Sequence, residues 1–287
     1  MTAAERTPVT VVIATRDRVA ELRRTLAHLA ALPEDPAVIV VDNGSKDGTA
    51  ATVSREFPRV TVIRNRRNRR AAARNQGVRR APSRYVAFSD DDSWWEPGAL
   101  ALACGLLGLH QQAGVIAGRT LVGERGADDP VNATLAASPL PAAGLPGPRV
   151  LGFLGCAIVT RRDAFLQAGG YRPLLGIGGE EELLALDLNA AGWAAVYVDT
   201  VVARHFPSAA RDVAGRRAAE QRNRVLVAWL RRPLRVAVRG TFALACRARR
   251  DPVARHALAG LLVRLPAALA TRRPLPPGVA AQLAMLG

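Results

Sequence analysis

Short apolar runs alternate with helix-like segments over the first hundred residues. Residues 9–14 and 37–41 are continuous, mostly β-branched runs, and segment 18–32 between them repeats leucine and valine at helical spacing. The same alternation predicts a helix over 46–56, a strand over 60–63, a helix over 69–80 and a strand over 85–88. Strands that alternate with helices in this way predict an α/β fold with a doubly wound, mostly parallel sheet and right-handed crossovers.

Polar residues follow three of these predicted strands. The segments are 15–17 (Thr-Arg-Asp), 42–45 (Asp-Asn-Gly-Ser) and 90–92 (Asp-Asp-Asp). Because ligands of doubly wound sheets bind beyond the carboxyl ends of the strands, we expect these segments to line a ligand site.

The second half of the chain has a less regular pattern. Residues 123–148 are rich in glycine, proline, alanine and aspartate without periodicity, which predicts a long mobile loop. The pattern then predicts a strand over 151–160, helices over 162–168 and 180–191 with a glycine turn at 176–179 between them, and short strands over 193–198 and 201–203.

The composition of the 287 residues narrows the class of protein. With 49% hydrophobic and 22% charged residues the chain can form a sizeable core, which excludes wholesale disorder, collagen and coiled coils. Three scattered cysteines without a Cys-x-x-Cys pair argue against a structural zinc site and favour a reducing compartment. The amino terminus lacks a charged-then-apolar leader and no stretch has 18 uninterrupted apolar residues, so we expect neither secretion nor a spanning helix.

The net charge of +16 is concentrated at the carboxyl end. Residues 211–287 contain 16 arginines against three acids, a net charge of +13, so residues 1–210 carry only +3. Two segments of this basic tail, 224–238 and 257–270, repeat apolar residues at helical spacing, and Pro233 and Pro266 are expected to interrupt them. In the first segment one face gathers the arginines Arg224, Arg231, Arg232 and Arg235.

Cationic amphipathic helices of this kind are typical of contact with an anionic membrane surface, here through residues 224–270. Helices that cover the body of the protein or build a homodimer are the alternative. The charge also suits nucleic acid, but the aromatic residues of the tail are only Trp229 and Phe242 and no recognised motif is present, so no specific nucleic acid is expected.

Acidic residues carry the candidate chemistry. Asp90 and Asp92 face the same way in an extended segment, which suits a hard divalent cation, with a solvated acidic loop as the alternative. Asp42 can accept hydrogen bonds from a base or ribose, although Asp-Asn-Gly is also ordinary turn chemistry. The three glutamates 180–182 stand at a helix start, where they either cap the helix or present a general base. His205 is either a ligand for a metal or diphosphate or a structural residue.

Taken in order, these segments resemble the family 2 glycosyltransferases of the GT-A fold. VTVVIATRDR resembles the opening strand of that family, VIVVDNGSKDGT its second strand and turn, AAARNQGV its Ala-Arg-Asn-x-Gly helix and YVAFSDDDSW its strand with the Asp-x-Asp motif. LGCAIVTRRDAFLQAGGYRP resembles the acceptor-side segment, and GGEEELLALDLNAAGW resembles the helix that usually begins Gly-Glu-Asp. The resemblance covers residues 7–207.

The resemblance implies roles for the matched residues. Contacts with the nucleotide sugar are implied for Thr15, Arg16, Asp17, Asp42, Ser45, Arg74, Asn75, Asp90 and Asp91. Binding of a divalent metal, Mg²⁺ or Mn²⁺, is implied for Asp92, with His205 as a further candidate. Contacts on the acceptor side are implied for Gly155, Arg161, Arg162, Gly179 and Trp193. The implied general base is Glu181, with Glu180 or Glu182 as substitutes.

The implied reaction is inverting transfer of a sugar from a nucleoside diphosphate sugar to a hydroxyl of a glycan or a lipid-linked acceptor of the cell envelope. The catalytic domain is then 1–210, with a nucleotide-sugar half at 1–100 and an acceptor half at 101–210, followed by the tail 211–287. The expected location is the cytoplasm, peripheral on the inner face of the cell membrane. Two residues depart from the family pattern, since Glu181 stands for the usual aspartate and an arginine stands near position 70, where glycine is common. An inactive relative is the alternative.

Overall fold

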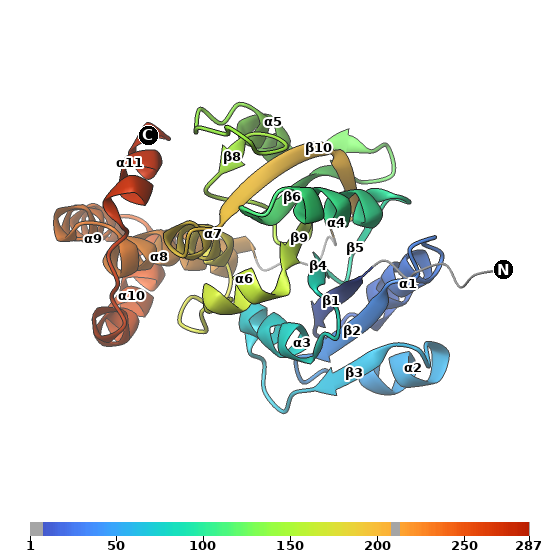
Figure 1. Cartoon of the computed structure of the whole chain (residues 1–287). Coiled ribbons are helices and arrows are strands. Elements are labelled where there is room, and N and C mark those ends of the chain that lie inside the picture. Colours follow the sequence, from blue (N-terminus) through green and yellow to red (C-terminus); the bar gives the residue numbers. More distant parts are fainter. Residues whose placement is uncertain (1–7, 208–212, 287) are drawn as a thin grey trace.

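One mixed sheet positions the polar ends of the strands (Figure 1). The structure is a computed structural model that describes residues 8–207 and 213–286. Within these residues ten strands form the sheet, in the order β3-β2-β1-β4-β9-β6-β10-β5, with β7 paired to β6 and β8 to β10. The strands are β1 (Val9–Thr15), β2 (Ala37–Asp42), β3 (Thr61–Arg64), β4 (Tyr85–Ser89), β5 (Ser93–Trp95), β6 (Ala113–Val122), β7 (Ala127–Asp128), β8 (Arg149–Val150), β9 (Ile158–Arg161) and β10 (Ala194–His205).

The direction of the strands brings several carboxyl ends to one edge of the sheet. Strands β3, β2, β1 and β4 are parallel, which confirms the predicted α/β arrangement. Strand β9 is antiparallel to both β4 and β6, so β6 again runs in the direction of β4, and β10 pairs with β6 in parallel. Thr15, Asp42 and His205, each the last residue of its strand, therefore lie at the same edge as the segment after β4.

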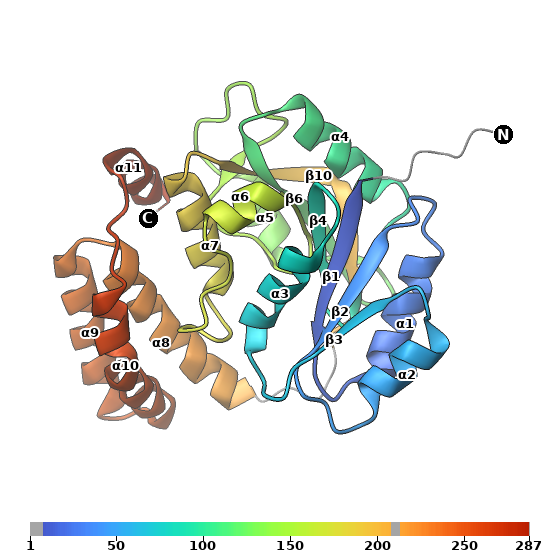
Figure 2. The same cartoon turned by 60° about the horizontal axis from the view of Figure 1, so that its bottom comes forward.

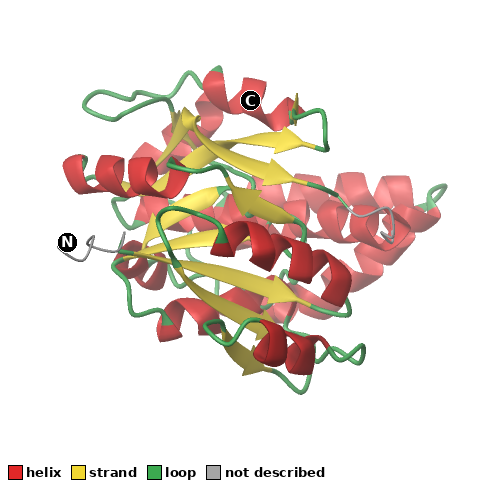
Figure 3. Ribbon diagram, turned by 90° about the vertical axis from the view of Figure 1, so that its right-hand side faces the viewer, coloured by secondary structure: helices red, strands yellow, loops and turns green. Residues whose placement is uncertain are grey.

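Alternate side chains of the central strands enter two cores on opposite faces of the sheet. Val11 and Ile13 of β1 belong to a core that includes leucines of α1 and α4, whereas Val12 belongs to a core with α3, α6 and α7. Figure 2 shows α3, α6 and α7 on one side of the sheet and α1 on the other, and Figure 3 shows the twist of the strands between them. The helices are α1 (Val19–Ala30), α2 (Thr49–Glu56), the 3₁₀ turn η1 (Arg70–Ala73), α3 (Arg74–Arg80), α4 (Ala99–Leu109), α5 (Pro130–Ala136), α6 (Arg162–Gln167) and α7 (Glu180–Ala190).

Several expectations for the second half of the chain were wrong. The predicted loop over 123–148 contains β7 and α5, and α5 is stabilised by Asp129, whose side chain accepts a hydrogen bond from the backbone N–H of Val131. The strand predicted over 151–160 begins only at Ile158, and the two short strands predicted near the end are the single strand β10. Strand β7 forms a hairpin with β6, and β10 is held by pairing with β6 and β5, which local periodicity does not encode.

Within residues 213–286 the basic tail forms four helices, which pack beside α7 against the rest of the chain (Figure 1). They are α8 (Val213–Arg231), α9 (Leu234–Ala248), α10 (Pro252–Ala270) and α11 (Pro277–Met285). Pro233 separates α8 from α9, as predicted, but Pro266 lies inside the continuous helix α10. Leu226 and Leu230 of α8 are buried in a third core with Leu183 and Leu186 of α7. The apolar face of α8 is therefore covered by the protein itself.

Helix α10 differs from the expectation that the chain has no segment able to cross a membrane. By length and composition alone, α10 is the one described helix that meets the requirements of a span. It packs along α8 and α9, with Ala254, Ala257, Leu261 and Ala268 buried against them, while Leu262 and Val263 remain exposed.

Arg231 joins the tail to the body through a buried ion pair, which corrects its predicted place on an exposed basic face. Its side chain is 3% exposed, and its Nη2 donates to Oδ2 of Asp187 on α7 at 2.9 Å. Removing Arg231 would leave the buried carboxylate of Asp187 with only Arg172, whose Nε is 3.6 Å from Oδ2. We therefore expect Arg231→Ala to lower the free energy of unfolding in urea by about 3–5 kcal/mol, whereas the exposed neighbour Arg235→Ala should change it by no more than about 0.5 kcal/mol. Equal stability of the two variants would contradict this prediction.

Candidate active site

The ends of β1 and β4 are tied together by a network around Asp91. The Thr15 hydroxyl donates to Oδ2 of Asp91 at 2.9 Å, and Nη1 of Arg18 donates to Oδ1 of Asp91 at 2.7 Å. Asp91 is 6% exposed, so both of its oxygens are used within the protein. Although Thr15 and Asp91 line the cleft described below, these contacts suit a structural role at the base of the site.

Asp92 and His205 come together from two different strands. Strand β5 pairs with the end of β10, which sets Ser93 opposite His205 and brings Nε2 of His205 to 3.3 Å from Oδ1 of Asp92. The other oxygen, Oδ2, lies 3.2 Å from Nη1 of Arg18. The carboxylate and the imidazole are thus held side by side without a direct link in the sequence, and one oxygen and one nitrogen of this pair suit a divalent cation.

Cys156 adds a thiol to the same neighbourhood. Ligand atoms of Asp90, Cys156 and His205 all lie within 4.8 Å of one another. Burial raises the pKa of Cys156 well above its ordinary value, and a hard divalent cation prefers oxygen ligands to a thiol. The aspartates and His205 are therefore the better ligand candidates.

Arg74 links Asp90 to the acids of α7. Its guanidinium forms an ion pair with Asp90 and lies 5.6 Å from the centre of the Tyr171 ring. The amide of the next residue, Asn75, donates to the carbonyl of Tyr171 at 2.8 Å and accepts from its N–H at 3.0 Å. Arg74 is thus an electrostatic part of the site, whereas the side chain of Asn75 holds the segment that precedes α7.

Helix α7 begins with the three glutamates, which face different surroundings. Glu180 lines the cleft and is 3% exposed, and the carboxyl groups of Glu180 and Glu181 act on each other's pKa. Burial and the neighbouring charge of Glu180 raise the pKa of Glu181 to about 8. The charges that act on Glu182 are those of Arg224 and Arg232 in the tail. Glu180 and Glu181 therefore form a pair of interacting carboxyl groups at the site, and Glu182 faces away from it.

Two glycines shape the surroundings of this pair. A Cβ atom added to Gly155 would lie 2.9 Å from Oε1 of Glu181, so a larger residue there would displace the carboxylate from its present position. Gly179 precedes the helix with φ +84°, in the left-handed region that favours glycine. Both residues, predicted on the acceptor side, lie beside the glutamates.

The turn after β2 is built by side-chain to backbone hydrogen bonds. Oδ1 of the buried Asp42 accepts from the N–H of Ser45 at 2.9 Å, and Oδ1 of Asp17 accepts from the N–H of Lys46 at 2.6 Å. The Ser45 hydroxyl accepts from the N–H of Asp17 at 2.9 Å. The neighbouring Arg16 lines the cleft. These bonds fix the first and second strand ends against each other.

Thr15 and residues 90–92, at the ends of β1 and β4, open onto a cleft of about 1000 Å³. Asp42 and His205, at the ends of β2 and β10, are not among the described residues that line it. Asp90–92, Arg74 and Glu180 are among its lining residues. Helices α8 and α10 of the tail also line it, with Arg216, Arg222, His256 and Arg264. The tail is therefore part of the cleft wall.

Three residues predicted on the acceptor side are not brought to this cleft. Arg161 pairs with Tyr85, the first residue of β4, so it lies at the end of the strand opposite to Asp90–92. Its Nε donates to the carbonyl of Ala113, and Arg162 donates to the carbonyl of Val78. Trp193 immediately precedes β10 at the same opposite edge. Contact with an acceptor does not fit these positions, and their hydrogen bonds assign them to the scaffold.

The sequence analysis missed several residues of the site. Arg18 holds both Asp91 and Asp92, and Tyr171 lies under Arg74. Arg18 directly follows the polar segment 15–17, and this position could have indicated that it belongs to the site. Arg222 and Arg264 carry no local signal, because only tertiary packing brings them to the cleft, and only packing brings Cys156 close to Asp90 and His205.

The chain is similar to known glycosyltransferases in sequence. A model of the family described as Glycosyl transferase family 2 matches residues 10–166. The N-acetylglucosaminyl-diphospho-decaprenol L-rhamnosyltransferase of Mycobacterium tuberculosis is 26% identical over 276 residues, which cover 78% of this chain and 86% of that protein. The succinoglycan biosynthesis protein ExoU of Rhizobium meliloti is 34% identical over 104 residues, 35% of this chain and 30% of that protein.

Solved structures share the fold. A mannosyltransferase of Pyrobaculum calidifontis, in complex with GDP-Man and Mn²⁺, superposes with a TM-score of 0.62 at 21% identity and covers 99% of this chain and 79% of that chain. GalNAc-T7, with UDP, GalNAc and Mn²⁺, superposes with a TM-score of 0.59 at 17% identity and covers 78% of this chain and 48% of that chain. At these identities the likeness shows the fold, which is that of GT-A enzymes.

Proposed function

This chain belongs to glycosyltransferase family 2 and is a glycosyltransferase, and on that premise we propose that it transfers a sugar, with inversion, from a nucleoside diphosphate sugar to a hydroxyl of a lipid-linked acceptor. The observation that carries the proposal is one cleft lined both by Asp92, which lies beside His205, and by Glu180, which lies beside Glu181.

We assign the donor side to the strand ends. Asp92 and His205 would hold a divalent cation, Mg²⁺ or Mn²⁺, which when bound neutralises charge on the diphosphate. The ion pair with Arg74 holds the carboxylate of Asp90 in place, where it would contact the donor sugar or the ribose. Asp42, at the end of β2, would meet the base or ribose.

We assign the general base to Glu181. It would accept the proton of the acceptor hydroxyl as that oxygen attacks the anomeric carbon from the face opposite to the leaving diphosphate. Arg74, whose charge acts on both glutamates, favours the ionised form of the pair. Glutamate in place of the usual aspartate reaches one methylene further, and Gly155 leaves the room for it.

The acceptor proposal follows from the curated relative, whose name gives a diphospho-decaprenol substrate. A polyprenyl acceptor is held at a membrane, so an enzyme acting on it gains from contact with the lipid surface. We therefore propose that the catalytic domain lies within residues 1–210 on the cytoplasmic side and that the tail approaches the inner face of the membrane.

The test of the proposed reaction is a panel of UDP-, dTDP- and GDP-sugars incubated with the purified protein. We expect one donor to raise the melting temperature and to be slowly hydrolysed in the presence of Mg²⁺ or Mn²⁺, with both effects lost in EDTA. The absence of a response to every donor would overturn the proposal in favour of an inactive relative.

The pH dependence of transfer follows from the raised pKa of Glu181. A general base works in its ionised form, so kcat/KM should rise about tenfold per pH unit below its pKa and level off above about 8. The measurement is a profile of kcat/KM for the acceptor from pH 6 to 9. A flat profile over this range would contradict the assignment.

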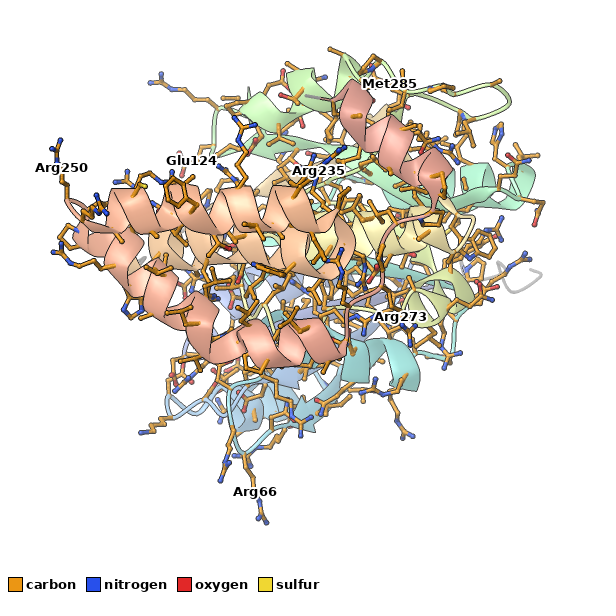
Figure 4. All side chains as sticks on the ribbon, turned by 90° about the vertical axis from the view of Figure 1, so that its left-hand side faces the viewer. Arg66, Glu124, Arg235, Arg250, Arg273 and Met285 are labelled. Carbon is orange, nitrogen blue, oxygen red and sulfur yellow. The ribbon has the colours of Figure 1, made fainter. Side chains whose placement is uncertain are left out.

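Helix α9 carries the surface that we propose for membrane contact. Leu234, Val238 and Phe242 form an exposed stripe at four-residue spacing, flanked by Arg235 and Arg239. Figure 4 shows α9 and α10 on the outer face of the molecule, with Arg235 and Arg250 extending from it. An apolar stripe with flanking cations suits the interface of an anionic bilayer.

Flotation with vesicles tests this surface. Replacement of the three stripe residues by serine should weaken binding to phosphatidylglycerol vesicles about tenfold or more, because their apolar area is no longer buried in lipid. Serine at Leu109, an 80% exposed leucine at the end of α4, is the matched control and should leave binding unchanged. Equal binding to vesicles of neutral lipid would contradict the role of the arginines.

A further inference from the structure

Three arginines from distant parts of the chain line the same wall of the cleft. Arg70 comes from η1, Arg222 from α8 and Arg264 from α10. A Cβ atom at Gly260 would lie 3.0 Å from Cδ of Arg222 and 3.6 Å from an Nη1 atom of both Arg222 and Arg264. The two guanidinium groups therefore approach each other across Gly260, where α10 has no side chain to separate them.

These arginines are held by neutral groups. Nη2 of Arg222 donates to the carbonyl of Leu175 at 2.9 Å, and Nη1 of Arg264 donates to the carbonyl of Gly260 at 3.1 Å. Within residues 8–207 and 213–286, no carboxylate forms an ion pair with Arg70, Arg222 or Arg264. In the same region Arg18, Arg74, Arg216 and Arg231 each have an acidic partner, which are Asp91, Asp90, Glu220 and Asp187. Arg69 and Arg79 also line the cleft without an acidic partner among the described residues, but Arg70 and Arg264 are the cations whose charges act on Arg222.

The uncompensated charges oppose each other. Burial, and then the charges of Arg264 and Arg70, lower the pKa of Arg222 to about 10. Arg70 also has φ +53°, a left-handed conformation that a residue with a side chain adopts at a cost, and its Cδ would be 2.9 Å from a Cβ on Gly176. An anion bound between the three groups would relieve their repulsion.

The wall adjoins the loop that presents the glutamate pair. Arg222 bonds to Leu175, Arg70 touches Gly176, and the amide of Asn223 on α8 donates to the carbonyls of Leu175 and Ile177 at 3.0 Å. This loop leads directly into Glu180 and Glu181. A ligand held by the arginines therefore lies beside the loop that leads into the proposed base.

We propose that Arg70, Arg222 and Arg264 bind a phosphate or diphosphate group of the acceptor, separately from the diphosphate of the donor. The proposal rests on the proposed function and deepens it, since it assigns recognition of the phosphate link in a lipid-linked acceptor to the tail. Guanidinium groups match phosphate oxygens with paired hydrogen bonds, and an uncharged glycan would not compensate three cations. The tail, through Arg222 and Arg264, would then hold the acceptor at the cleft.

Binding of farnesyl diphosphate, compared with farnesol, tests the proposal in EDTA by titration calorimetry. We expect the diphosphate to bind and the alcohol to bind at least about tenfold more weakly. Arg222→Gln and Arg264→Gln should each weaken diphosphate binding about ten- to a hundredfold, the loss expected for hydrogen bonds to a charged group. Arg264→Lys, which keeps the charge without the planar fork, should lie between these variants and the wild type.

Two matched variants provide the controls. Arg255→Ala removes an exposed arginine from the same helix α10, and Arg66→Ala removes one that extends into solvent near Arg70 (Figure 4). Both should bind farnesyl diphosphate within about twofold of the wild type. The melting temperature of each variant shows whether it is folded. If a glutamine variant does not fold, the comparison of Arg264→Lys with the wild type still tests the proposal.

The outcomes distinguish the source of the phosphate. Two results together support an acceptor site. Farnesyl diphosphate stays bound to the wild type in the presence of excess UDP, dTDP and GDP, and the arginine variants bind these nucleotides in Mn²⁺ as tightly as the wild type does. Displacement by a nucleoside diphosphate, with an equal loss of nucleotide affinity in the variants, would overturn it in favour of the donor. Equal affinity for farnesol and its diphosphate would also overturn it. Donor hydrolysis by the wild type is scored separately, so its absence counts against the proposed transfer and not against this site.

Discussion

Glu181→Gln is expected to lower the turnover of sugar transfer by about 10²–10⁴-fold while donor affinity stays unchanged. The glutamine keeps the shape of the side chain but cannot accept the proton of the acceptor hydroxyl, and general base catalysis is typically worth this factor. Burial and the charge of Glu180 already disfavour the ionised form of Glu181, so the neutral amide should leave the folded state at least as stable. The measurements are kcat under saturating substrates and donor affinity by calorimetry.

Glu182→Gln is the matched control for this variant. Glu182 is adjacent in the sequence, but the charges that act on it are those of Arg224 and Arg232, so its neutralisation should leave turnover within about threefold. Glu180→Gln distinguishes the two members of the pair. A larger loss of turnover in Glu180→Gln than in Glu181→Gln would transfer the role of base to Glu180, which lines the cleft.

Asp92→Asn is expected to lower both metal affinity and turnover, the latter by about a hundredfold or more. The substitution removes the negative charge that lies between His205 and Arg18, and stabilisation of charge on a departing diphosphate is worth several kcal/mol. Binding of Mn²⁺ followed by electron paramagnetic resonance reports the first effect without any turnover. The donor-induced rise in melting temperature should disappear with it.

Asp199→Asn controls for the loss of one negative charge, because Asp199 is exposed on β10 away from the cleft. It should bind Mn²⁺ as the wild type does. His205→Ala should weaken Mn²⁺ binding less than Asp92→Asn, since it removes a neutral ligand and leaves the carboxylate. Unchanged affinity of Asp92→Asn for both Mn²⁺ and the donor would refute the assignment of Asp92.

The strand ends show how much of the site local sequence predicts. A buried β-branched run followed by polar residues marks where a parallel strand ends, and the ends of parallel strands meet at one edge of a sheet. Asp42, Asp90 and Asp92 are therefore correctly expected at one edge from the pattern alone. The role on the acceptor side that the resemblance implied for Arg161 has no such support, because β9 is antiparallel to its neighbours and Arg161 lies at the opposite edge.

The basic tail shows what the sequence does not predict. Its helices and the break at Pro233 follow from helical spacing and from the missing N–H of proline. Which of its arginines face solvent does not follow, since Arg231 is buried against Asp187, and Arg222 and Arg264 line the cleft. An amphipathic pattern indicates that a helix has a buried face but not which surface covers it.

The sequence by itself determines the α/β class, the family and the polar segments after the strands, because these depend on short-range periodicity and local motifs. The tertiary structure alone decides the contact of His205 with Asp92, the separation of Glu182 from the glutamate pair and the entry of the tail into the cleft wall. Each of these depends on packing between segments distant along the chain. Such packing is selected by burial of apolar area over the whole fold, to which no short stretch of sequence is a guide.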